Sequence, residues 1–219
     1  LIDHLSKYKL RSKVEIKDLS SSHVVGIISK DKFEEIQKEL NSKEKTVLYR
    51  ESQCFVDTRL PSLGARILSN LEKLHLTIKK LNLNIVDKSH YLKLNHKEGI
   101  PVEGLKNLQN NLFGLETNFE ELNAIDFKKG CYVGQENTAR IKLKNRLRRR
   151  LLPVISNSPL KISDEIKFNN QVVGKVMIGD QYSFALIKLF DPEFKTFSKQ
   201  NLKIKETSIQ ILNPSYFKI

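Results

Sequence analysis

The sequence predicts a soluble α+β protein, with a mixed helical and stranded body over residues 1–144 and a small antiparallel β-barrel or sandwich over residues 145–219. The composition, 39% hydrophobic and 29% charged over 219 residues, is typical of a folded globular chain. Helix-spaced segments and alternating strands interleave in the body. In the C-terminal part, short β-type runs are separated by turn pairs such as Asn169-Asn170 and Gly179-Asp180.

The first part of the body has alternating helical and stranded patterns. The predicted elements are a helix at 2–10, strands at 13–21 and 22–29, a helix or polar excursion at 30–45, and strands at 46–52 and 53–59. Pro61 and Gly64 then indicate a turn before a short strand that ends near residue 69.

The rest of the chain leads from the body into the C-terminal part. Residues 70–84 form a lysine-rich amphipathic stretch that could be a helix or a strand. A helix that begins near Asp87 or Ser89 should follow and end at Gly99 and Pro101. A polar connection follows, and a further helix is expected after Gly134. The predicted C-terminal strands lie within 149–156, 165–170, 171–179 and 182–190.

Whole-chain features limit the function classes. No apolar run approaches the roughly 20 residues that cross a bilayer, so we expect no membrane insertion. Two distant cysteines make no disulfide scaffold and cannot alone supply the usual four thiolates of an iron-sulfur cluster, which favours a reducing compartment. The net charge of +13 suggests an anionic partner, but lysine is abundant throughout, and we favour compositional bias as its cause. The five histidines lack zinc-ligand spacing.

The stretch DFKKGCYVGQENTAR, residues 126–140, is the strongest candidate for chemistry. Gly130 and Gly134 bracket Cys131 and suit a tight turn that exposes its side chain. Lys129 and the start of the following helix would favour the thiolate, which is the form that reacts and binds metal. A lone cysteine is more often a small buried hydrophobic residue, and Cys54 in its predicted strand receives that interpretation.

Three short motifs carry a family resemblance: KGCYVGQE at 129–136, LETN at 115–118 and GIP at 99–101. Together they resemble the signature of the YgfZ folate-binding family. That family belongs to the GcvT-like superfamily of the glycine-cleavage aminomethyltransferase and includes mitochondrial iron-sulfur cluster assembly factors. A looser similarity extends from Leu1 to about Leu189.

The resemblance implies an α+β folate-binding body and a C-terminal antiparallel β-barrel around a central opening that holds tetrahydrofolate. It implies that Cys131 is a working thiol beside Lys129, and that the thiol could briefly ligate an iron without forming a stable metal site. The implied folate-binding residues are Glu116, Asn118, Tyr132, Gln135, Glu136, Arg59 and Arg66.

General chemistry suits several of these assignments. A carboxylate such as that of Glu116 can accept paired hydrogen bonds from a pterin, Tyr132 can stack on an aromatic face, and an arginine suits the anionic glutamate tail. Each residue also has an ordinary structural alternative. Glu116 could cap a helix, Tyr132 could belong to the core, and Arg59 and Arg66 could form ion pairs.

The chain departs from the family pattern at two places. The family commonly has an arginine before GIP, where this chain has Asn95 or His96. Because Leu1 begins within a helical pattern, we expect that an N-terminal part is missing. The segment that carries the aminomethyltransferase's essential aspartate would lie just upstream of Leu1. This sequence therefore does not exclude transferase activity.

These observations predict a tetrahydrofolate-binding protein that supports assembly or repair of iron-sulfur clusters in client enzymes, including tRNA-modifying ones. The partners would be those clients or assembly proteins. The location would be the cytoplasm in a bacterium or the mitochondrial matrix in a eukaryote. One alternative is a folate-dependent aminomethyltransferase. The other is a basic RNA-binding module that uses the run KLKNRLRRR at 142–150. We favour a solvated face at the domain boundary for this run, and RNA binding, if present, should be weak and non-specific because no aromatic residue interrupts it.

Overall fold

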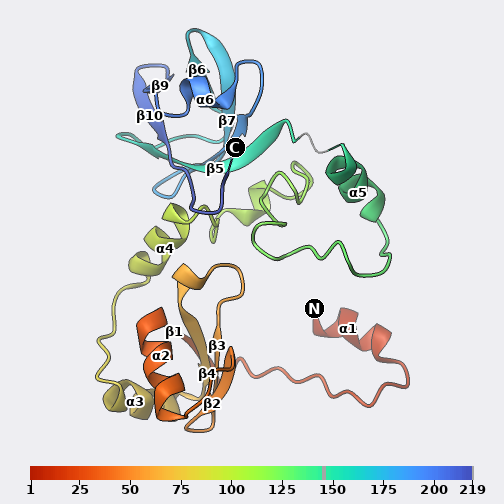
Figure 1. Cartoon of the computed structure of the whole chain (residues 1–219), viewed down its shortest axis with the longest axis vertical. Coiled ribbons are helices and arrows are strands. Elements are labelled where there is room, and N and C mark those ends of the chain that lie inside the picture. Colours follow the sequence, from red (N-terminus) through yellow and green to blue (C-terminus); the bar gives the residue numbers. More distant parts are fainter. Residues whose placement is uncertain (145–146, 219) are drawn as a thin grey trace. The chain divides into compact units, whose positions relative to one another are not determined.

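The computed structural model describes residues 1–144 and 147–218, and it contains two compact units, Leu1–Ile85 and Val86–Ile219 (Figure 1). The fold is α+β with a closed antiparallel β-barrel, which confirms the predicted fold class. The predicted boundary after residue 144 falls at residues 145–146, outside the described residues, and stays a prediction. No helix in the described residues is long and apolar enough to cross a membrane.

The first unit is built on a four-stranded antiparallel sheet with the order β1-β4-β3-β2. Its elements are α1 (Ile2–Lys9), β1 (Val24–Ile28), α2 (Lys30–Glu39), β2 (Thr46–Tyr49), β3 (Ser52–Val56), the 3-10 helix Pro61–Leu63, β4 (Ala65–Ser69) and α3 (Leu71–Lys80). Residues 13–21 form no strand, so that prediction is wrong. Alternation alone cannot supply the neighbouring strand that a β-ladder needs.

One face of this sheet carries the core of the first unit. Phe33 and Ile36 lie three residues apart on α2 and therefore share its buried face, which packs with alternating strand residues such as Cys54 and Ile67. Ser29 caps α2 by accepting a hydrogen bond from the Lys32 N–H. Burial raises the pKa of the Cys54 thiol to about 11, so the structural interpretation of Cys54 is confirmed.

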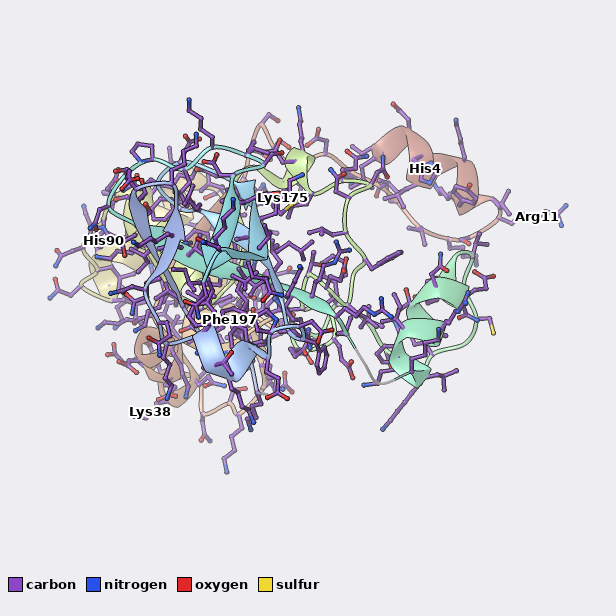
Figure 2. All side chains as sticks on the ribbon, turned by 90° about the horizontal axis from the view of Figure 1, so that it is seen from above. His4, Arg11, Lys38, His90, Lys175 and Phe197 are labelled. Carbon is purple, nitrogen blue, oxygen red and sulfur yellow. The ribbon has the colours of Figure 1, made fainter. Side chains whose placement is uncertain are left out.

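The second unit contains the barrel, whose strands close in the order β10-β5-β8-β7-β6-β9. Its elements are α4 (Lys88–Lys97), the 3-10 helix Leu105–Asn107, α5 (Gln135–Leu143), β5 (Arg149–Ser156), β6 (Glu165–Phe168), β7 (Gln171–Ile178), β8 (Phe184–Lys188), α6 (Phe194–Phe197), β9 (Leu202–Ile204) and β10 (Thr207–Ile211). The short β-type runs in the sequence predicted strands β5 to β8, but they did not predict α6, β9 or β10. The short helix α6 contributes Phe197, which is fully buried in the barrel's core (Figure 2).

His96 anchors α4 to the barrel. Its Nε2 lies 2.9 Å from the Ser183 carbonyl oxygen, and its ring packs edge-on against Phe184. Burial lowers the pKa of His96, and hydrogen bonds to the Ser183 and Val154 backbone oppose that shift only in part. The imidazole is therefore held neutral in the folded protein at neutral pH.

We expect acidification to destabilise the protein through His96. The pKa of this group is lower folded than unfolded, so the unfolded chain binds more protons below its ordinary pKa of about 6.5. His96 therefore contributes stability that is present above about pH 6.5 and is lost as the pH falls toward the folded pKa. Denaturant unfolding from pH 7.5 to 5 should show a steeper loss for wild type than for His96→Gln, which does not titrate. Equal slopes would contradict this role.

Candidate functional site

The LETN segment, residues 115–118, is hydrogen-bonded to strand β5 of the barrel. The Leu151 N–H donates to the Glu116 carbonyl at 2.8 Å, and the Asn118 amide returns a hydrogen bond to the Leu151 carbonyl at 2.9 Å. Asn118 has a φ of 64°, a left-handed conformation that asparagine tolerates better than most residues. The amide of Asn118 is thus buried and used in holding this segment against β5.

The Glu116 carboxylate is buried, with 7% of its side chain exposed. Its Oε2 accepts a hydrogen bond from the Phe113 N–H at 3.1 Å. Its Oε1 accepts from Arg149 Nε at 2.9 Å and lies 2.9 Å from Arg149 Nη2. A buried charge is tolerated when it is paired and hydrogen-bonded in this way.

Three ion pairs join residues 116–121 to the basic run at 142–150. They are Glu116 with Arg149, Glu120 with Lys142, and Glu121 with Arg150. Arg150 is held further by the Leu115 carbonyl and the Asn118 side chain, each 3.0 Å from its Nη1. Among the described residues of this run, Lys142, Arg149 and Arg150 are therefore engaged within the protein, which weakens their attraction for RNA.

A cavity of about 850 Å³ opens beside Glu116. Its cationic lining residues are Lys144, Arg148, Arg149 and Lys188, and its anionic ones are Glu116 and Asp191. Phe113, Ile141, Leu147 and Phe190 add apolar surface. The cavity has the size of a small-molecule site, and its charges suit a ligand with a polar donor edge and carboxylate groups.

Cys131 lies on an exposed turn that leads into α5. Gly134 caps this helix with a φ of 85°, and the Gln135 Oε1 accepts a hydrogen bond from the Tyr132 N–H at 3.1 Å. Tyr132 and Val133 are exposed beside the sulfur. The turn therefore presents the thiol on the surface, where a partner's side chain can reach it.

The structure separates the signature residues from the Glu116 cavity. Among the described residues that line the cavity, none comes from the 129–136 signature. Lys129 and Glu136 are exposed on the Cys131 turn and on α5, respectively, and the side chain of Gln135 holds that turn. The predicted contacts of Tyr132, Gln135 and Glu136 with folate stay predictions.

Arg59 and Arg66 belong to the first unit, where both bind Asp57. Arg59 donates to both Asp57 oxygens, at 3.0 and 2.7 Å, and Arg66 donates twice to Asp57 Oδ2, at 3.2 and 3.1 Å. Burial alone would raise the pKa of Asp57, but hydrogen bonds from both arginines and the charge of Arg59 outweigh it and hold the pKa below its usual value. The ion pairs agree with the structural alternative for these arginines.

Sequence reasoning missed Arg149 as a site residue. It placed Arg149 in a solvated basic run, whereas the structure sets its guanidinium on Glu116. The available signal was the matching charge of two segments, with glutamates at 116, 120 and 121 facing lysine and arginine at 142, 149 and 150. In the described residues, no three His, Cys, Asp or Glu side chains gather as metal ligands.

Curated relatives of the chain are mitochondrial proteins named iron-sulfur cluster assembly factor IBA57 or its homologue. The Dictyostelium discoideum protein is 34% identical over 157 residues, which are 69% of this chain and 37% of the relative. The Mus musculus protein is 32% identical over 163 residues, 73% of this chain and 43% of the relative. The chain thus spans about two fifths of the length of these relatives.

A solved structure shows the same fold. The glycine cleavage system aminomethyltransferase T from Bartonella henselae superposes with a TM-score of 0.63 over 99% of this chain and 65% of its own, at 10% identity. No family model matches the chain. The superposition confirms the predicted GcvT-like architecture and speaks for the fold alone.

Proposed function

We propose that the chain is a YgfZ-type protein related to the IBA57 proteins, that it binds tetrahydrofolate, and that it supports assembly or repair of iron-sulfur clusters in client enzymes. The relatives' names support the iron-sulfur role and a mitochondrial location. The assignment of tetrahydrofolate as the ligand is supported by the site itself. The observation that carries it is a buried glutamate at the wall of a cavity whose other charged residues are mostly cations.

The residues present fit tetrahydrofolate in its two polar parts. Glu116 supplies a buried acceptor for the amino and ring N–H donors of a pterin, and Lys144, Arg148 and Lys188 supply positive charge for the carboxylates of the tail. When bound, tetrahydrofolate supplies a carrier for one-carbon units. The chain's own contribution is to orient that ligand through Glu116, which the Phe113 N–H holds in place.

Cys131 is the working thiol of this proposal. Its sulfur is exposed on a turn, so it can ligate an iron of a cluster shared with a client or exchange with a client's oxidised cysteine. Cys54 is buried in β3 and cannot take part in either step, so exchange with a client disulfide would form a mixed disulfide at Cys131 and release the client's other sulfur as a thiolate. The remaining thiolates of a cluster would come from the partner.

The two alternatives have weaker support. Lys142, Arg149 and Arg150 form ion pairs with glutamates and are therefore less available to bind RNA phosphates. Any RNA affinity should be weak and should decrease as the salt concentration rises. For aminomethyltransferase activity, the support is that this chain shares the fold of the Bartonella henselae enzyme, but the two sequences are only 10% identical. The KGCYVGQE signature favours the assembly role over transfer.

Calorimetric titration with tetrahydrofolate tests the ligand assignment. Glu116→Ala should bind at least about a hundredfold more weakly than wild type, because paired hydrogen bonds to a charged group contribute about 1.5–3 kcal/mol each. Glu120→Ala is the matched control, since it removes the same charge from the same segment and breaks only the pair with Lys142. A folded wild type that binds no tetrahydrofolate would refute the proposal, and unchanged binding by Glu116→Ala would refute the role of Glu116.

A further inference from the structure

Strand β1 is an open edge of the four-stranded sheet in the first unit (Figure 1). In the part of the chain that the structure describes, β1 pairs with β4 alone. The Ile28 carbonyl oxygen lies against Gly64, just before β4, so Ile28 and the alternate residues of β1 direct their backbone groups toward β4. The N–H and C=O groups of Val25 and Ile27 therefore point to the open edge.

Strand β1 has none of the features that normally protect an exposed edge. Its sequence, VVGII, contains no charge and no proline, and its ladder with β4 runs without a bulge. Val25 and Ile27 alternate with the buried Ile28, so they lie on the face opposite the core, where they are 56% and 41% exposed. An apolar edge of this kind is a template for pairing with another strand.

We propose that β1 pairs with β1 of a second copy of this chain, in an antiparallel ladder whose twofold axis passes through Gly26. In this register Val25 lies opposite Ile27 of the partner subunit, and Val24 lies opposite Ile28 of the partner subunit. The two sheets then join into one continuous sheet across the dimer. This pairing is independent of the tetrahydrofolate and iron-sulfur roles.

The sequence of β1 is suited to this twofold pairing. Two valines precede Gly26 and two isoleucines follow it, so every cross-strand pair beside the axis joins two β-branched side chains, which favour strands. Val25 and Ile27 direct their backbone groups to the open edge and would exchange both hydrogen bonds with the partner subunit. Gly26 would then occupy the close, non-hydrogen-bonded position on the axis, where it has no side chain to crowd its copy.

Helix α3 adds apolar surface beside this edge. Leu74 packs over Gly26, because a Cβ added at Gly26 would lie 3.3 Å from Leu74 Cδ1. Leu71 lies three residues before Leu74, on the same side of the helix, and is 70% exposed. The exposed apolar surface of β1 therefore continues onto the helix that covers it.

The other edge of the sheet, β2, is protected against the same pairing. Lys45 and Arg50 directly flank the four residues of β2. A twofold pairing of β2 would place Lys45 opposite Arg50 of the partner subunit twice, and like charges directly opposite one another are destabilising. In the β1 register the flanking pair is His23 with Ser29, which brings no such charges together. The edge open to a second copy is therefore β1.

Analytical ultracentrifugation of the full chain tests the pairing. In about 150 mM salt, which screens the net charge of +13, wild type should become dimeric as its concentration rises from about 1 to 300 µM. Val25→Lys should lower the association constant at least about tenfold, because it places a charge at the paired edge. Leu48→Lys is the matched control, since Leu48 is 63% exposed on β2 in the same cross-strand row as Val25, and it should leave dimerisation unchanged.

A charge-swap experiment separates lost pairing from lost folding. Val25→Lys combined with Ile27→Lys should be monomeric, and so should Val25→Glu combined with Ile27→Glu, because like charges would lie opposite one another. When the two double variants are mixed, they should form a heterodimer, since every lysine then lies opposite a glutamate. Thermal unfolding verifies that each variant is folded.

Hydrogen exchange of wild type reports the register. The amides of Val25 and Ile27 should exchange more slowly at high protein concentration, while that of Gly26, which points toward β4, should change little. A wild type that stays monomeric, a dimer that Val25→Lys leaves intact, or swapped variants that stay monomeric when mixed would each overturn the proposal. Particles larger than a dimer would also overturn it, because a twofold pairing closes at two copies.

Discussion

Thiol-selective labelling of the native protein at pH 8 is expected to modify Cys131 at least about a thousandfold faster than Cys54, for two independent reasons. Cys131 is exposed on its turn, whereas Cys54 has no exposed surface and reacts only when the sheet opens. Burial also raises the pKa of Cys54 to about 11, so only about one molecule in a thousand carries its thiolate at pH 8.

Peptide mapping after timed labelling measures both rates in one sample. In denaturant the two cysteines should label at similar rates, which shows that the native difference comes from the fold. Comparable rates in the native protein would mean that Cys131 is protected or that β3 opens easily. Either result would remove the structural basis for treating Cys131 as the working thiol.

Replacement of Cys131 by serine should abolish the protein's support of iron-sulfur clients in cells that lack the native protein. The sulfur is the only part of this side chain that can ligate iron or exchange with a thiol, and a serine hydroxyl does neither at neutral pH. The side chain is exposed, so the variant should unfold at the same temperature as wild type. Tetrahydrofolate affinity should also be unchanged, because Cys131 does not line the Glu116 cavity.

Val133→Ser is the matched control for this experiment. Val133 is fully exposed on the same turn, so its replacement changes the same surface without touching a thiol. The activity of iron-sulfur client enzymes in cell extracts should be restored by Val133→Ser and stay at the level of the empty vector with Cys131→Ser. Full restoration by Cys131→Ser would make Cys131 a passive residue and end the proposed mechanism.

The sequence determined those features whose physics is local. The helix of α4 begins at Asp87, whose side chain accepts from the Ser89 N–H, and α5 begins after Gly134, as the capping and glycine signals predicted. The hairpin of β2 and β3 and the strands β5 to β8 follow their alternation and turn residues. Cys54 is buried and Cys131 exposed, as their neighbours in the sequence indicated.

Tertiary structure decided which polar side chains face one another. The strand predicted at 13–21 did not form, because alternation specifies a face but not a partner strand. Arg149 and Glu116 are 33 residues apart, and only the packing of residues 115–118 against β5 brings the guanidinium onto the carboxylate. Charge in a sequence shows that a side chain can bind, but its partner depends on distances that only the folded chain sets. That is why the sequence identified Glu116 as a ligand-binding candidate, while the ion pair that occupies it became visible only in the structure.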